Sequence, residues 1–250
     1  MEKEKLKNNG AIKIKNIIDS EYINDIIKYL TTKEDIDKEP YSNSPYRTNV
    51  DINRLFELDK QISNRINNII KDYLDDDFEL YSITGHFKDR WNGAEEHWHQ
   101  DYNYNIMTHN GKPYDFYRIF IALDNHIKDN GCMMFMNKSS TEGSLKFTSM
   151  LSIHSHEKKR TDYNILNKCF EKYGLEYYEL NKGDGILFDS LILHSSHSNQ
   201  TPYPRRALQI QLIRKNVTKK SEEEINNCYE RRKKFEIDSL KKIIKKKKNI

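Results

Sequence analysis

The sequence predicts an α+β domain with a mainly β core, in which antiparallel strands follow a layer of N-terminal helices. Two segments in the first third of the chain repeat apolar residues at helical spacing. From residue 79 onward the apolar residues instead alternate with polar ones or cluster in short runs. The turns between these runs contain Gly, Asn, Asp or Pro, which is typical of short loops between antiparallel strands.

The first expected elements are identified by changes in the spacing of apolar residues along the sequence. Residues 11–18 (AIKIKNII) alternate and predict a strand. Residues 19–30 carry apolar side chains on one helical face, and Asp19 or Ser20 can cap that helix. Two prolines predict a loop over 40–48, and a second amphipathic helix is expected over 55–74.

The strands of the core are expected in six segments. A helix over 161–174, closed by Gly174, belongs to a longer excursion between the fourth and fifth of them. The predicted strands are 79–87, 97–105, 117–124, 132–136, 185–194 and 207–214.

Length and composition are those of a folded protein. A chain of 250 residues can bury a sizeable core, and 26 Phe plus Tyr residues (10 and 16) argue against a disordered polymer. The three cysteines show no Cys-x-x-Cys spacing, so neither a disulfide framework nor a zinc knuckle is expected. The charged N-terminus does not resemble a secretory signal, and no apolar run would span a bilayer. We therefore expect a soluble, cytoplasmic protein.

The positive charge is concentrated at the C-terminus. Residues 215–250 hold 13 Lys/Arg against 6 Asp/Glu, a balance of +7, which leaves 4 − 7 = −3 for the rest of the chain. The body therefore gives no strong nucleic-acid signal. We expect one domain over 1–214 and a charged, Lys-rich helix or tail over 215–250. The tail could make weak contacts with anionic surfaces, although a solvated tail is the simpler interpretation.

A candidate metal site begins in the stretch HWHQDYNY. On a strand, His99 and Asp101 would point to the same side, so both could reach one ion. By itself a His-x-Asp triplet is more often a solvated pair. His194, at the end of an apolar strand, can supply the third ligand of the two-His, one-carboxylate set that holds iron(II) in non-haem oxygenases. His97 is not needed to complete this set.

A carboxylate clamp accompanies the third ligand. Arg205, at the start of the last predicted strand, can bind a carboxylate bidentately, which lysine cannot do. Ser196 lies two residues after His194, and therefore on the same side, and can donate to the same carboxylate. Arg206 is a rival for the clamp, but its spacing from His194 is less suitable.

Together these motifs resemble the phytanoyl-CoA dioxygenase family over roughly residues 10–214. The resemblance rests on GAIKIKNIIDSEYINDIIKYL, WHQD, IALDNHIKDNGCMMFMNKSS, GDGILFDSLILHSS and the Asn-x-Thr-Pro-x-Pro-Arg segment, in the family's order. It implies a double-stranded β-helix (a cupin-like jelly roll) with flanking N-terminal helices. It also implies a dioxygenase that uses Fe(II), 2-oxoglutarate and O2, hydroxylates a C–H bond of a small-molecule substrate, and releases succinate and CO2.

The resemblance also assigns roles to residues. His99, Asp101 and His194 match the iron ligands, whereas Arg205 and Ser196 match the residues that hold the far carboxylate of 2-oxoglutarate. Phe120 falls where an aromatic residue often lies beside the co-substrate, and Phe87 is a further candidate for that pocket. The NKSS segment departs from the family's usual Pro-Gly-Ser-His type of turn, which we expect to change a rim loop.

Two alternatives remain open at this point. A jelly-roll binding module without catalytic activity could retain these residues by descent. A hydrolytic zinc site would use the same ligands, but would give Arg205 no function. The substrate is not predictable from the sequence, because the loops that select it, such as 40–50, 88–96 and 140–180, carry no decodable motif.

Overall fold

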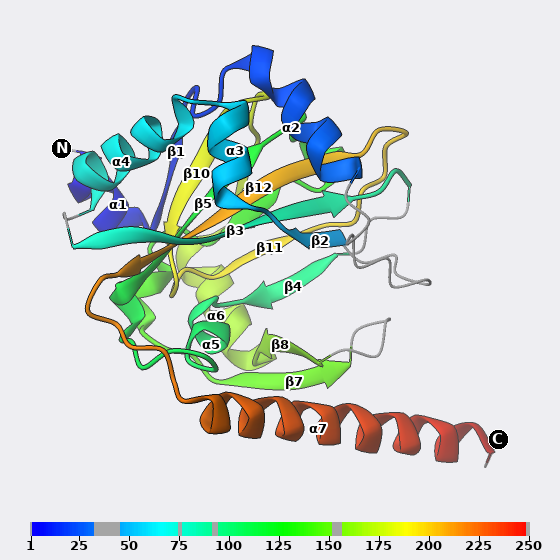
Figure 1. The fold of residues 1–250 in the computed structure, drawn as a ribbon. Coiled ribbons are helices and arrows are strands. Elements are labelled where there is room, and N and C mark those ends of the chain that lie inside the picture. Colours follow the sequence, from blue (N-terminus) through cyan, green and yellow to red (C-terminus); the bar gives the residue numbers. More distant parts are fainter. Residues whose placement is uncertain (1, 33–45, 75–76, 92–94, 152–156, 249–250) are drawn as a thin grey trace.

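Two antiparallel sheets face each other in the computed structural model, which describes residues 2–32, 46–74, 77–91, 95–151 and 157–248 (Figure 1). The larger sheet has the order β1-β10-β5-β12-β3-β2 and the smaller one β4-β11-β6-β9. Strands that lie far apart in the sequence are neighbours in both sheets, as a jelly roll requires. The larger sheet contains β1 (Ala11–Ile14), β2 (Tyr46–Asn49), β3 (Phe78–Lys88), β5 (Phe116–Ala122), β10 (Gly185–Asp189) and β12 (Arg205–Arg214).

The smaller sheet carries His99, His194 and Ser196 of the candidate site. Its strands have three or four residues each. They are β4 (Glu96–His99), β6 (Met133–Phe135), β9 (Glu176–Tyr178) and β11 (His194–Ser196). A separate hairpin, β7 (Phe147–Leu151) with β8 (Glu157–Thr161), and the helix α6 (Tyr163–Tyr173) lie between β6 and β9 in the sequence.

Helices cover the outer face of the larger sheet (Figure 1). Their apolar stripes join one core cluster with Ile83, Ile119, Leu208 and Ile210 of the sheet. These helices are α1 (Glu2–Asn9), α2 (Ser20–Thr32), α3 (Ile52–Leu58) and α4 (Ile62–Tyr73). Short 3-10 turns occur at Pro113–Asp115, Lys128–Asn130 and Ser139–Glu142.

Strand alternation sends one set of side chains outward and another into the space between the sheets. Leu208, Ile210 and Leu212 of β12 join the helix-side cluster, whereas Ala207 packs with Phe120 and other residues of the second, inner cluster. Because side chains in a strand alternate, Arg205 shares the inner face with Ala207. The clamp residue predicted from the sequence therefore points between the two sheets.

The predicted helix over 55–74 is wrong as a single element, because the chain breaks it at Asp59. The backbone of Asp59 is extended, and its buried carboxylate accepts hydrogen bonds from the Gln61 amide and from Arg65. Those contacts end α3 and turn the chain into α4.

The predicted strand over 185–194 is also two elements. The Asp189 carboxylate accepts the amides of Leu191 and Ile192, both at 2.8 Å, and the turn carries the chain from the larger sheet to the smaller one. The apolar run does not reveal this turn, because the residues before the turn and the residues after it are all buried.

The C-terminal helix was predicted, whereas several short elements were not. The expected C-terminal helix is α7 (Glu222–Lys248), which extends beyond the two sheets (Figure 1). The sequence did not predict α1, β2, β7, β8 or β9, which are short or strongly polar. Most of the expected loop at 40–48 lies outside the described residues. In the part of the chain that the structure describes, no helix combines the length and apolarity needed to cross a bilayer.

Candidate metal centre

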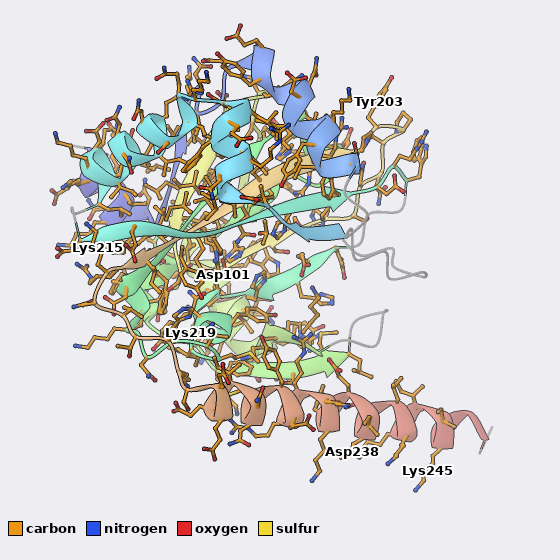
Figure 2. All side chains as sticks on the ribbon, viewed as in Figure 1. Asp101, Tyr203, Lys215, Lys219, Asp238 and Lys245 are labelled. Carbon is orange, nitrogen blue, oxygen red and sulfur yellow. The ribbon has the colours of Figure 1, made fainter. Side chains whose placement is uncertain are left out.

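Three side chains converge at the mouth of the space between the sheets, where Asp101 lies near the centre of the molecule (Figure 2). His99, Asp101 and His194 each offer one ligand atom, and these atoms all lie within 4.8 Å of one another. Oδ1 of Asp101 is 3.6 Å from Nε2 of His99 and 3.9 Å from Nε2 of His194. The residues predicted from two distant segments are therefore brought together.

The local backbone that presents His99 and Asp101 differs from the expected strand. β4 ends at His99, and Asp101 has helical dihedrals at the start of the short helix α5 (Tyr102–Asn105). Gln100, between them, is fully buried, and its amide bonds to the Gly143 and Leu191 carbonyls. The shared direction of the two ligands thus comes from a strand-to-helix turn rather than from strand alternation.

His194 is held by a turn that depends on two serine hydroxyls. The Ser140 hydroxyl donates to Asp189, and the Ser139 hydroxyl accepts the Leu193 amide at 2.8 Å. Both serines belong to the NKSS segment, which the sequence placed on a rim loop. They are buried instead, because they anchor the residue immediately before His194.

Both candidate histidines present the same nitrogen to the site. Nδ1 of His99 lies 2.5 Å from the His97 carbonyl, and Nδ1 of His194 lies 3.0 Å from the Ile192 carbonyl. A carbonyl accepts a hydrogen, so each Nδ1 is the protonated nitrogen and each Nε2 is left with a free lone pair. Burial, with His99 as the next cause, lowers the pKa of His194 to about 4, so this imidazole is neutral at pH 7.

Asp101 is kept ionised by its neighbours. Burial by itself would raise its pKa, but the guanidinium of Arg118 and the two histidines hold the pKa well below its usual value. Nε of Arg118 donates to Oδ2 of Asp101 at 2.8 Å, which leaves Oδ1 directed at the histidines. Asn105 accepts a second hydrogen bond from Arg118 at 2.9 Å and fixes the guanidinium.

The donor set fits a divalent first-row metal with open coordination positions. Neighbouring ligands at about 2.1 Å from an octahedral ion are about 3 Å apart, so the two Asp101 distances exceed a bound geometry by less than about 1 Å. Two imidazoles and one carboxylate make the facial set used by non-haem iron enzymes. No thiolate takes part, which argues against a structural zinc site.

A second polar group lies deeper between the sheets. Arg205 is 3% exposed, and its Nη1 donates to the Gly131 carbonyl at 2.9 Å. Its Nε is buried with no hydrogen-bond partner among the described residues. Burial lowers the pKa of Arg205 to about 10. Phe120 lies beneath it, with the guanidinium carbon 5.4 Å from the ring centre, so these two predicted residues are neighbours.

Lys88 adds a second buried cation beside Arg205. The two residues are paired across β3 and β12, and Lys88 is fully buried. Its ammonium donates to the carbonyls of Ser196 and His197, the first at 3.3 Å. Burial, followed by the charge of Arg205, lowers the pKa of Lys88 well below its usual value. Among the described residues no carboxylate lies within ion-pair distance of either cation, so this end of the space favours an anion.

Two further predicted residues have different outcomes. Ser196 lies on β11 beside Lys88, and is therefore at the same end as Arg205. Phe87 is not in the site, because it belongs to the helix-side cluster on the outer face of the larger sheet. Since alternate residues point inward, His86 and Lys88 face the inner space in its place, and the His86 ring lies 6.1 Å from Phe120.

The rival arginine and the neighbouring aromatics are also placed. Arg206 forms a two-pronged ion pair with Asp124 on the outer side, at 2.7 and 2.9 Å, and is not available to the site. His97 pairs with Glu95 at 3.4 Å and stays outside the triad. The Tyr104 ring packs edge-on against His99 at 5.8 Å, because α5 replaces the expected strand.

Sequence reasoning missed Arg118 and Lys88, and a signal for both existed. Arg118 lies two residues before Phe120 and Lys88 lies two residues after His86, so each shares the inward face of an apolar strand. Charged side chains are rarely fully buried unless they are paired, so a charged residue at an inward position of a buried strand indicates a polar site inside the fold.

Comparisons with known proteins give one family. The model of the phytanoyl-CoA dioxygenase (PhyH) family matches residues 8–207. A curated protein of Dictyostelium discoideum, a phytanoyl-CoA dioxygenase domain-containing protein 1 homolog, is 28% identical over 136 residues. The match covers 54% of this chain and 46% of that protein, so the chain spans about half the length of this curated relative.

Solved structures with the same fold include several crystallised with small molecules. EvdO2 from Micromonospora carbonacea var. aurantiaca, complexed with 2-oxoglutarate, has a TM-score of 0.68 and 16% identity, over 88% of this chain and 92% of that one. The epimerase SnoN, in complex with Fe3+, alpha-ketoglutarate and nogalamycin RO, has a TM-score of 0.71 and 12% identity, over 88% and 85%. EctD from S. alaskensis, with 2-oxoglutarate and 5-hydroxyectoine, has a TM-score of 0.62 and 16% identity, over 84% and 74%. These likenesses confirm the jelly-roll fold.

Proposed function

The chain belongs to the phytanoyl-CoA dioxygenase family, and on that premise we propose that it is a non-haem Fe(II)- and 2-oxoglutarate-dependent dioxygenase. In this proposal it hydroxylates a C–H bond of a small molecule and releases succinate and CO2. We assign the activity to residues 1–214, with 215–250 as an appended segment.

One observation carries the proposal. The two Nε2 atoms and the Asp101 carboxylate oxygen lie together on one side of the space between the sheets, and two buried cations without a carboxylate partner among the described residues lie further in. A 2-oxo diacid matches both features, because it carries a chelating end and a second carboxylate.

In the proposed site, His99, Asp101 and His194 hold the iron. When bound, Fe(II) with 2-oxoglutarate supplies the oxidising chemistry that activates O2 and replaces a C–H bond with C–OH. The chain's own contribution is to orient both imidazoles through their Nδ1–carbonyl contacts, and to keep Asp101 ionised through Arg118.

The inner end of the site fixes the co-substrate. Arg205 has Nε free in the described structure, and Nη2 lies beside it on the same guanidinium edge. These two donors can bind one carboxylate in the bidentate mode. Ser196 supplies a hydroxyl at the same end, and Phe120 supports the guanidinium from below. This clamp orients the 2-oxo acid and discriminates against monocarboxylates, since a monoacid would leave a buried cation unpaired.

The reaction outcome and the substrate belong to the proposal. The structural neighbours include an epimerase, so the fold alone does not select hydroxylation. Hydroxylation rather than halogenation is supported by Asp101, which fills the position that halogenating relatives leave open for halide.

The test is a titration with Mn(II), a spectroscopically visible ion that prefers the same ligands. We expect one Mn(II) per chain by electron paramagnetic resonance, and tighter Mn(II) binding when 2-oxoglutarate is present, because the two ligands stabilise each other. His194→Ala should abolish the site, whereas His97→Ala, at a half-buried histidine outside the triad, should not. If 2-oxoglutarate leaves Mn(II) affinity unchanged in the wild type, the proposal is wrong and a binding module without catalysis is the better description.

A further inference from the structure

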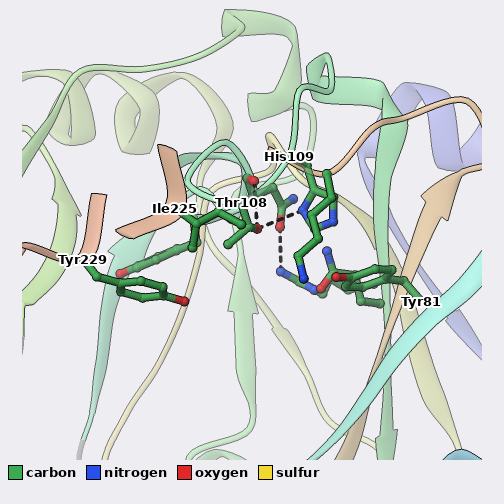
Figure 3. A pocket seen from close by; sticks show the side chains of 10 residues that line it. Tyr81, Thr108, His109, Ile225 and Tyr229 are labelled. Carbon is green, nitrogen blue, oxygen red and sulfur yellow. Dashed lines mark hydrogen bonds between the residues drawn. The ribbon is translucent and has the colours of Figure 1, made fainter. Parts of the chain in front are cut away.

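A second cavity lies beside the metal centre and has no place in the proposed chemistry. It has a volume of about 400 Å³, and the triad does not line it. Tyr81 and Tyr229 lie on opposite sides of it, with Thr108 and His109 between them (Figure 3). Arg118, which holds Asp101, forms part of its wall.

The C-terminal segment forms part of the wall of this cavity. The backbone of Lys219 bridges to that of His109, and the Asn110 amide donates to the Thr218 carbonyl at 2.9 Å. Ile225 and Tyr229 of α7 then complete the wall. All of these C-terminal residues lie beyond residue 207, where the family match ends. The cavity is therefore built partly from a segment outside the family match.

Two buried polar atoms in the lining have no partner among the described residues. They are Nε2 of His109 and Nδ2 of Asn105, and each of these residues is 3% exposed. A buried polar group without a partner is costly, and native structures avoid it unless a ligand or a function accounts for it. The other polar atoms of the same two side chains are bonded to Thr108 and Arg118, so both residues are fixed in place.

The charge of the lining is positive. Lys219 contributes a cation, Arg118 contributes a second one that is paired with Asp101 outside the lining, and none of the ten residues that form this cavity is acidic. In the described part of the chain, no carboxylate lies within ion-pair distance of the Lys219 ammonium. The guanidinium of Arg118 uses Nε and one Nη2 hydrogen for Asp101 and Asn105, so further donors remain. Donors therefore dominate the polar surface of the cavity, and the complementary ligand is an anion.

The apolar part of the lining indicates a ring. Three tyrosines, Tyr81, Tyr104 and Tyr229, surround the space, and Tyr81 packs edge-on against His109 at 4.8 Å. A volume of 400 Å³ equals that of roughly thirteen water molecules, which suits a small molecule rather than a chain or a polymer. Aromatic walls with a few fixed polar groups are typical of small-ligand sites.

We propose that this cavity binds a small organic carboxylate with a ring-containing body. Its carboxylate lies against Lys219, Asn105 and Arg118, and its ring lies between the tyrosines. The site is separate from the 2-oxoglutarate position at Arg205, and shares Arg118, Asn105 and Tyr104 with the surroundings of the triad. The inference goes beyond the proposed dioxygenase activity and does not depend on a bound metal.

The test uses the metal-free full chain and two matched pairs of probes. Benzoate and 3-phenylpropionate are the carboxylates, and benzyl alcohol and 3-phenylpropanol are their neutral counterparts. In saturation-transfer NMR at pH 7 we expect the carboxylates to bind saturably with Kd near about 1 mM or tighter, and at least about tenfold more tightly than the alcohols. Equal binding of acids and alcohols, or no binding of the acids, would overturn the proposal.

Variants then locate the binding. Lys219→Gln should weaken carboxylate binding several-fold, whereas Lys220→Gln, the adjacent lysine outside the lining, should not. His109→Phe should weaken binding while leaving thermal stability equal or higher, because it removes a buried polar atom without a partner. Arg205→Met should leave the affinity unchanged. Binding that is lost in Arg205→Met but kept in Lys219→Gln would place the acids at the proposed 2-oxoglutarate position and refute a second site.

Discussion

Replacing Arg205 with methionine separates affinity for the co-substrate from stability. Nη1 of Arg205 is engaged by the Gly131 carbonyl, so Nε and Nη2 are the donors left for a carboxylate. Two charge-assisted hydrogen bonds at about 1.5 to 3 kcal/mol each give a loss of about 3 kcal/mol or more. We therefore expect Arg205→Met to weaken 2-oxoglutarate binding at least about a hundredfold.

The assay is isothermal titration calorimetry of 2-oxoglutarate into the Mn(II)-loaded protein. Arg206→Met is the matched control, because Arg206 is adjacent in sequence but pairs with Asp124. It should change the affinity less than about threefold. The ligand-free Arg205→Met protein should unfold at an equal or higher temperature, since a buried cation without a carboxylate partner has been replaced by an apolar side chain. Unchanged 2-oxoglutarate affinity in Arg205→Met, or an equal loss in Arg206→Met, would refute this reasoning.

Three other predictions follow from the surroundings of the site. Arg118→Met should weaken Mn(II) binding by about tenfold or more, and increasingly so between pH 7 and 5.5, because only the two histidines then oppose the rise in the Asp101 pKa caused by burial; Mn(II) titrations at both pH values measure this, and a pH-independent loss would contradict it. Gly131→Ala should lower the free energy of unfolding in urea by about 2 to 4 kcal/mol, since φ is +78° and a Cβ would meet the His197 carbonyl; a change under about 0.5 kcal/mol would be inconsistent with that backbone. Burial, and then the charge of Arg205, lowers the pKa of His126 to about 3, below its unfolded value near 6.5, so its contribution to stability is complete above pH 6.5 and is lost towards pH 3. In urea unfolding, the wild type should therefore lose about 2 kcal/mol of stability between pH 7 and 5 that His126→Gln does not lose. An unchanged pH dependence in His126→Gln would exclude His126 as its source.

The residues of the site were predictable where their chemistry is unusual for their position. His194 after an apolar run and Arg205 before an alternating strand have few structural explanations, and the structure brings both to the inner space. The turn that delivers His194 was not predictable. It depends on Ser139 and Ser140, about 50 residues earlier in the chain, whose hydroxyls bond to the Asp189 turn.

Errors arose where strand alternation was assumed from a short pattern. Phe87 is a candidate only through its place on the strand before the triad, and the register of β3 against β12 places Lys88 opposite Arg205 and turns Phe87 towards the helices. A register shift of one residue moves every side chain to the other face, and pairing is set by contacts that a single sequence does not display. Asp101 shows the converse case, because its role was anticipated although its backbone conformation was not.

The most direct test of the central claim is an anaerobic titration of the metal-free protein with Fe(II) and then 2-oxoglutarate. We predict a weak visible charge-transfer band, characteristic of a 2-oxo acid chelated to Fe(II), that saturates at one equivalent in the wild type. It should need a higher 2-oxoglutarate concentration in Arg205→Met and be absent in His194→Ala. A wild-type protein that binds Fe(II) weakly or not at all, and shows no band at saturating 2-oxoglutarate, would contradict the assignment of His99, Asp101 and His194 as an iron site.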